Sequence, residues 1–126
     1  MKQINEESKL LESRNKEIAK SIEELETAFK TQYNKMAAEA DKMRAYRHSS
    51  EYKGMSDAEQ SSINVRHREL KAGLKKMRDE EKKNLETRIA ALRSEAKANE
   101  DAINANSLKL KSVGNASILG YDNYNL

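Results

Sequence analysis

Cysteine and proline are both absent from this chain of 126 residues, and each absence narrows what the chain can be. Without cysteine there are no disulfides, no thiolate nucleophiles and no zinc–thiolate sites. Without proline, nothing forces a long helix to kink or stop. Glycine occurs only four times. The sequence therefore favours long, uninterrupted helices.

Large apolar side chains are scarce. Hydrophobic residues make up 37% of the chain and charged residues 36%, against about 25% charged in ordinary globular domains. A compact globule of this length needs a larger core, so the apolar residues must form a narrow stripe. The charges nearly cancel at a net +3, whereas disorder is typical of a high net charge. Glu, Lys, Ala, Leu, Arg and Gln dominate and are strong helix formers. We therefore predict an elongated, soluble, all-α protein.

Targeting and membrane-spanning segments are not visible in the sequence. The first residues contain no apolar run that resembles a signal peptide. No stretch approaches the roughly 18 consecutive apolar residues that a membrane helix needs. We expect cytosolic synthesis and no membrane partner.

The first part of the chain carries two seven-residue series of apolar residues, offset by four positions. One series is Ile4, Leu11, Ile18 and Leu25, and the other is Ile22, Phe29, Met36 and Met43. Together they predict the seam of a coiled coil. Polar residues interrupt the seam at Ser8, Asn15, Gln32 and Glu39. Tyr33, Ala37 and Ala40 indicate that the seam shifts sideways after Phe29, as an insertion in the heptad would cause.

A segment of turn composition separates this helix from a second one. We predict helix 1 at about residues 3–47, a loop at about 48–55 and helix 2 at about 56–112, all within one helical region, residues 1–113. Ser56 and Glu59 have the spacing of a capping box at the start of helix 2. Gly73 lies within the second stripe, where it is expected to permit a close approach of another backbone.

The second helix carries its own apolar stripe, interrupted by Glu81, Asn99 and Asn106. Its average spacing is closer to 3.6 residues than to 3.5, so strong supercoiling is not required. The two helices are expected either to fold back as an antiparallel hairpin or to remain extended in a coiled-coil bundle of copies. The residues predicted to form the helical interface in either case are Ile18, Ile22, Leu25, Phe29, Met36, Leu70, Leu74, Met77, Leu85 and Leu92.

The last residues differ in composition from everything before them. Gly114 is placed to end helix 2, and charge nearly vanishes after it. We predict that residues 114–126 form an extended tail that docks on a protein partner. Its docking side chains are Ile118, Leu119, Tyr121, Tyr124 and Leu126.

One charged feature stands out in helix 2. Basic residues three or four positions apart share one helix face: Arg68, Lys71, Lys75, Arg78 and Lys82. Such a row can follow a phosphate backbone. Acidic residues in the same stretch weaken its field, and no aromatic residues are interleaved for base stacking.

Catalytic chemistry has little support in the sequence. The two histidines, His48 and His67, are far apart and lie in no metal or catalytic motif. Adjacent carboxylates such as Glu23 and Glu24 need a pocket to shift their pKa values, and two thin helices offer none. We therefore expect no catalytic, cofactor or metal site and no small-molecule substrate.

These features favour a non-enzymatic structural or adaptor subunit of a larger assembly. A hairpin with polar residues in its seam buries little apolar surface alone, so we expect self-association or a protein partner. A virion or phage particle is one setting for such a subunit, by analogy. The alternative is a helical nucleic-acid-binding or polymerase-associated regulator that uses the basic helix face.

Overall fold

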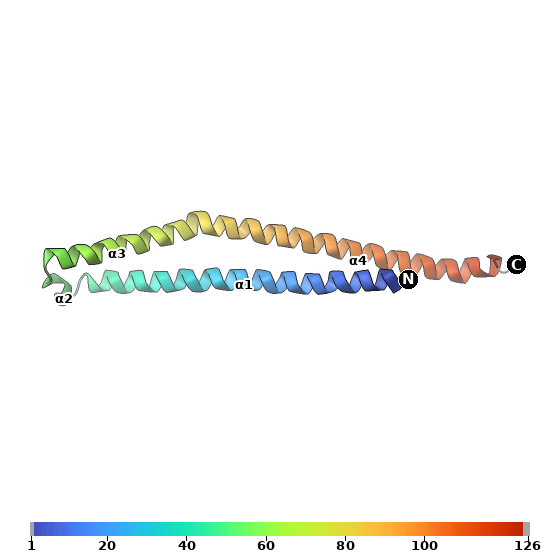
Figure 1. The fold of residues 1–126 in the computed structure, drawn as a ribbon, viewed down its shortest axis with the longest axis horizontal. Helices are drawn as coiled ribbons and strands as arrows, with labels where there is room; N and C mark the ends of the chain where they lie inside the picture. Colours follow the sequence, from blue (N-terminus) through green and yellow to red (C-terminus); the bar gives the residue numbers. More distant parts are fainter. Residues whose placement is uncertain (1, 125–126) are drawn as a thin grey trace. The chain divides into compact units, whose positions relative to one another are not determined.

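The computed structural model of this chain describes the backbone of residues 2–124 and the side chains of residues 2–112. All regular elements in this part are helical. They are α1 (Lys2–Tyr46), α2 (Ser50–Lys53), α3 (Asp57–Lys76), the π-helical turn η1 (Met77–Glu81) and α4 (Lys82–Tyr124). The prediction of an all-α fold with two long helical stretches is confirmed (Figure 1).

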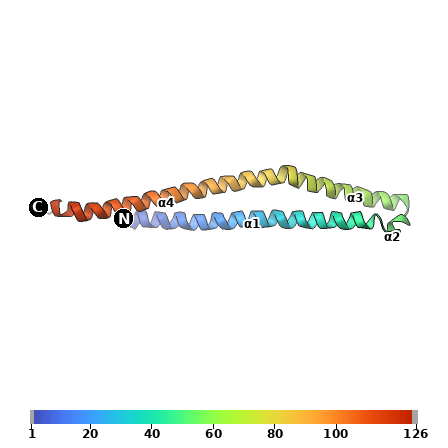
Figure 2. The same ribbon diagram turned by 180° about the vertical axis from the view of Figure 1, so that it is seen from behind.

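Two compact units divide the chain. The first combines Met1–Ile22 with Ile89–Leu126, and the second is the continuous segment Glu23–Arg88. In the first unit, the start of α1 lies antiparallel to α4 (Figure 1). In the second, the end of α1 lies antiparallel to α3, and the connection that contains α2 joins them (Figure 2). Each unit is therefore a pair of antiparallel helices.

The covered face of α1 follows the predicted seam up to Phe29 and then shifts. Ile18 is the most deeply buried apolar residue, with 1% of its surface exposed. After Phe29, Gln32 is exposed whereas Tyr33 is half-buried, and the rings of Phe29 and Tyr33 stack with centroids 6.3 Å apart. Two successive four-residue steps, from Leu25 to Phe29 and on to Tyr33, are the heptad insertion that the sequence indicates.

The π-helical turn η1 interrupts the helix predicted for residues 56–112. Met77 is buried, and the next residue that is not fully exposed is Leu85, eight positions later. Two α-helical turns span about 7.2 residues, and a π turn takes up one residue more. With η1 between them, Met77 and Leu85 keep to one face of the helix. Residues after η1 leave the register that an unbroken α-helix would give.

Serine side chains organise the connection between the long helices. The Ser49 hydroxyl accepts from the Tyr52 backbone N–H at 3.2 Å and caps α2. The Ser56 hydroxyl accepts from the Glu59 backbone N–H at 3.3 Å, which makes Ser56 the N-cap of α3, as predicted. The Glu59 carboxylate accepts from the same hydroxyl at 3.0 Å. These bonds satisfy N–H groups that a helix start leaves free.

The end of the chain departs from its prediction. α4 continues to Tyr124, so the backbone predicted to be extended from residue 114 is helical up to that point. Gly114 does not end the helix, because one glycine costs only about 1 kcal/mol relative to alanine and no proline follows. The side chains of residues 113–126 lie outside the described part of the chain. The predicted docking residues among them are Ile118, Leu119, Tyr121, Tyr124 and Leu126.

Candidate functional site

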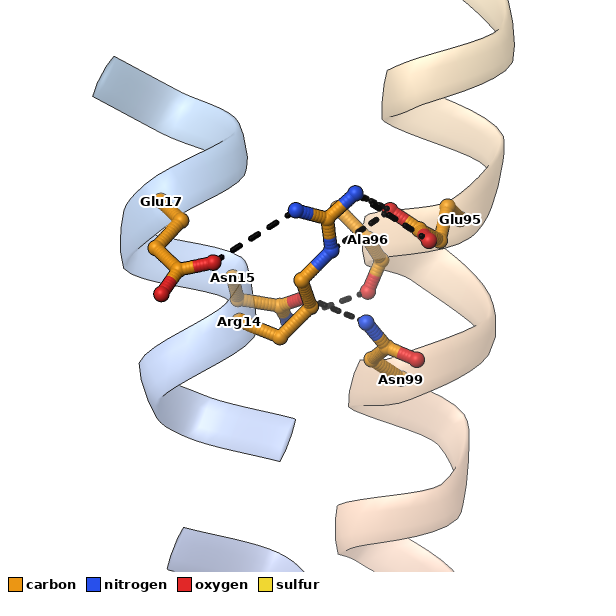
Figure 3. A network of polar contacts seen from close by, with 6 residues as sticks. All are labelled: Arg14, Asn15, Glu17, Glu95, Ala96 and Asn99. Carbon is orange, nitrogen blue, oxygen red and sulfur yellow. Dashed lines mark hydrogen bonds and ion pairs between the residues drawn. The ribbon is translucent and has the colours of Figure 1, made fainter. Parts of the chain in front are cut away.

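Polar interruptions of the two stripes meet one another in the first unit. Asn15 donates from Nδ2 to the Ala96 carbonyl oxygen at 3.1 Å and accepts at Oδ1 from Asn99 Nδ2 at 3.0 Å (Figure 3). Elsewhere in this unit, the buried Asn106 donates from Nδ2 to Ser8 Oγ at 3.2 Å. These polar groups therefore satisfy one another inside the seam. We call Asn15, Ala96 and Asn99 the asparagine layer.

An ion pair flanks the asparagine layer on its exposed side. Arg14 donates from Nε to Glu95 at 3.2 Å, and its Nη2 lies 3.0 Å from a Glu95 carboxylate oxygen (Figure 3). Glu17 lies 3.5 Å from Nη1 of the same guanidinium. The hydrogen bond to Glu95, followed by its charge, raises the pKa of Arg14. Because solvent screens both partners, this pair orients the two helices more than it stabilises them.

The predicted helical interface is covered to two different degrees. Ile18 and Met77 are buried. The other eight residues are half-buried: Ile22, Leu25, Phe29, Met36, Leu70, Leu74, Leu85 and Leu92. Gly73 is a point of close approach, since a Cβ atom added there would lie 2.6 Å from Cε of Met36. A single neighbouring helix therefore covers each stripe only from one side.

The second unit carries a groove lined mainly by basic side chains of α1, α3 and η1, which we call the basic groove. It comprises two cavities of about 400 Å³ and 220 Å³ that share His67 and Lys71 as lining residues. Its permanently basic residues are Arg44, Arg47, Arg68, Lys71, Lys75 and Arg78. The one carboxylate among the lining residues, Asp41, is ion-paired with Arg44. The charge of the basic groove is therefore strongly positive.

His67 is the most buried side chain of the basic groove, with 4% of its surface exposed. Arg47 Nη1 lies 3.1 Å from His67 Nδ1. A guanidinium can only donate, so Nδ1 accepts and the neutral ring carries its proton on Nε2. Burial, followed by the charges of Lys71, Arg47 and Arg44, lowers the pKa of His67. Near neutral pH the ring is uncharged and holds Arg47 in place.

The basic groove differs from the basic face predicted from the sequence. Of the five predicted residues, Arg68, Lys71, Lys75 and Arg78 line it, whereas Lys82 lines neither cavity. Lys82 was placed by α-helical spacing from Arg78, and it directly follows η1, where that spacing no longer holds.

Among the arginines, lysines and histidine that line the basic groove, three do not belong to the predicted face: Arg44, Arg47 and His67. The usable signal was the pair of arginines three positions apart at the end of helix 1, just before the predicted loop. Antiparallel pairing brings that end beside the start of helix 2.

The lowered pKa of His67 should make stability depend on pH. Unfolding returns His67 to its ordinary pKa near 6.5, so below about pH 6.5 the unfolded chain binds a proton that the folded chain does not. Stability should thus be complete above about pH 7.5 and decrease toward about pH 5.5. We expect a lower urea midpoint at the acidic pH. His67→Gln should reduce this difference, while His48→Gln, at the exposed histidine, should preserve it. Equal midpoints for the unaltered chain would contradict the prediction.

A further cavity of the same unit is mainly apolar. It has a volume of about 390 Å³. Met43, Tyr46, Ile63 and Leu70 form its apolar lining, with Glu39, Lys42 and Arg66 beside them. The ring of Tyr46 meets that of Tyr52 edge-on, with centroids 6.3 Å apart. Burial raises the pKa of Tyr46, as do the carboxylates of Glu51 and Glu59. We call this cavity the apolar groove.

The described residues contain neither a candidate metal-binding cluster nor a candidate membrane-spanning helix. Within this part of the chain, no three histidine, aspartate or glutamate residues are grouped so that they could hold a metal ion. No helix there combines the length and apolarity needed to cross a membrane. No protein-family model, no curated protein and no solved structure matches the chain.

Proposed function

We propose that this protein is a non-enzymatic structural or adaptor subunit that joins a larger assembly through its helical faces. The observation that carries the proposal is the shortage of buried apolar surface. Among the residues with described side chains, the buried apolar ones are Ile18, Ala40, Met77 and Ile89. A further helix, from a second copy or from a partner protein, would cover the half-buried stripes and gain about 25 cal/mol for each Å² of apolar surface removed from water.

Two exposed leucines in the first unit add to this uncovered surface. Leu10 on α1 is 71% exposed and Leu108 on α4 is 66% exposed. One exposed leucine is ordinary, but these two accompany stripes that are themselves only half-covered. Residues 115–126 would add a docking segment to the same assembly. A virion or another large particle is a setting that suits such a subunit.

Sedimentation at several protein concentrations tests this proposal. We expect the apparent mass to rise with concentration, and Leu10→Lys combined with Leu108→Lys to weaken association by roughly ten-fold while helicity is kept, since charges cannot be buried unpaired. Deleting residues 115–126 should likewise weaken association.

The matched control adds the same two charges at exposed alanines of the same helices, Ala19→Lys and Ala91→Lys. This control should associate like the unaltered chain. A monomer whose mass is independent of concentration, and which binds no partner from its native source, would contradict the proposal.

Nucleic-acid binding, including the role of a polymerase-associated regulator, is a second candidate function. The specific observation in its favour is that Arg44 of α1 and Arg47, the residue that follows α1, line the same groove as Lys71, Lys75 and Arg78. A basic face formed by two helices concentrates positive charge more than a single helix face does.

A further inference from the structure

We propose that the basic groove binds successive phosphate groups of a double-helical nucleic acid along its backbone, without reading the bases. The proposed site lies wholly within the second unit. The assembly proposal uses other surfaces, namely the half-covered stripes and the exposed leucines of the first unit, and Leu74 is the one predicted interface residue that also lines the basic groove.

The charge balance of the basic groove favours a polyanion. Six permanent cations line it, and Asp41 is the only carboxylate among its lining residues. Because Asp41 is paired with Arg44, it offers little competition to an incoming anion. The acidic residues that dilute the basic stretch in the sequence, such as Glu69 and Asp79, do not line either cavity.

The spacing of these cations fits a row of phosphates better than one anion. Lys71, Lys75 and Arg78 follow one another at successive turns, and one turn of α-helix rises about 5.4 Å. Arg44 lies in the last turn of α1, and Arg47 follows directly after the helix, three positions later. Lys71, Lys75 and Arg78 are exposed, so their charges are accessible to a ligand that lies along the groove.

Arg47 is the side chain best prepared for a phosphate oxygen. His67 fixes its guanidinium through the 3.1 Å contact. Its Nε is buried and has no hydrogen-bond acceptor among the described residues. A buried donor without an acceptor costs free energy, and an oxyanion would supply that acceptor. Arginine is well suited to phosphate because its planar donors form two parallel bonds.

The lining of the basic groove distinguishes a nucleic-acid backbone from an acidic protein. Protein interfaces are enriched in aromatic residues and methionine. The apolar groove has such residues in Met43 and Tyr46, but the two cavities of the basic groove are lined by none. Without aromatic rings the site lacks the usual stacking platforms for unpaired bases, so a duplex, whose backbone is its accessible face, fits better than a single strand.

Fluorescence anisotropy with a short labelled DNA duplex, in a buffer free of phosphate, tests the proposal. We expect the chain to bind the duplex. The logarithm of the association constant should fall linearly with the logarithm of the salt concentration, with a slope near −4 for about four neutralised phosphates. Lys71→Gln combined with Lys75→Gln should weaken binding by roughly ten-fold and reduce the slope by about two. Neither lysine is in the covered helical interface, so helicity should be retained.

The matched control is Lys76→Gln combined with Lys82→Gln, which removes the same charge from exposed lysines that line neither cavity. This control should bind duplex like the unaltered chain. An equal loss of affinity in the control would overturn the proposal, because net charge alone would then explain binding. Absence of duplex binding at low salt would overturn it too.

Histidine NMR signals locate the site directly, because the chain has only two histidines. Duplex should shift the ring signals of His67 and leave those of the exposed His48 unchanged. Three further probes address the alternatives: inorganic phosphate, single-stranded DNA and polyglutamate. The ligand concentrations are compared per negative charge. If any one of these probes shifts the His67 ring signals at a lower concentration than duplex does, the duplex-backbone proposal is wrong. That result would assign the groove to a free anion, an unpaired strand or an acidic protein, respectively.

Discussion

Replacing Ile18 by alanine should lower the free energy of unfolding by about 2–4 kcal/mol, the largest effect expected of any single apolar substitution in the first unit. Ile18 is 1% exposed, so the change removes a side chain that is wholly out of water and leaves a cavity behind. Typical domains are stable by only about 5–15 kcal/mol. The loss would therefore take a large part of the stability of a thin helix pair.

Urea unfolding followed by far-ultraviolet circular dichroism measures this loss, at one fixed protein concentration below the range in which the chain associates, because association also stabilises. Leu10→Ala is the control, since Leu10 is 71% exposed and its change should stay within about 0.5 kcal/mol. Leu25→Ala and Phe29→Ala should fall between the two, because both side chains are half-buried. If Ile18→Ala matched Leu10→Ala, the seam would not be the core of the first unit.

The seam itself was predictable from sequence, because helical periodicity is local information. The heptad positions from Ile4 to Phe29, the sideways shift to Tyr33 and the Ser56 cap all depend on residues at most a few turns apart. The structure agrees with the shift and the cap. Gly73 was expected to admit another backbone, whereas the atom found closest to it is Cε of the Met36 side chain.

The basic groove was only partly predictable from the sequence, because part of its lining comes from a distant segment that antiparallel folding brings beside α3. Arg44 and Arg47 join Lys71 and Lys75 only after the chain folds back. Lys82, which the sequence placed on the same face, lies outside the groove for a different reason. A single π turn changes the register of everything after it, and no simple rule of composition places such a turn at Met77–Glu81.

The extended tail was predicted from composition, and composition does not fix backbone conformation. Apolar and aromatic residues after Gly114 suggested a docking peptide, yet the backbone stays helical to Tyr124. With no proline to stop it, a helix that is already nucleated propagates more easily than a new one starts.

The asparagines at seam positions are a different case. In the sequence they indicate a weak seam, whereas in the structure they meet each other and can fix the alignment of the two helices. Asn15 accepts from Asn99 and donates to the Ala96 carbonyl. These bonds form only when the two helices are aligned in one way. Sliding either helix by a turn would bring an asparagine against an apolar side chain and leave its amide unpaired, at about 1–3 kcal/mol. Polar seam residues fix the alignment of coiled coils in the same way, because every other alignment would leave a buried polar group unpaired.

Asn15→Leu should therefore destabilise the chain by about 1–3 kcal/mol, because it leaves the Asn99 amide without its partner. Adding Asn99→Leu should restore stability or exceed that of the unaltered chain, since a matched apolar pair replaces a polar one. The double variant should nevertheless lose its single alignment, because leucine packs against leucine in several registers. Urea midpoints measure the first two effects, and the number of amide peaks per residue in two-dimensional NMR spectra measures the third. A double variant that is more stable and still gives one peak per amide would show that apolar packing alone sets the alignment, and the asparagine layer would then be a tolerated polar contact.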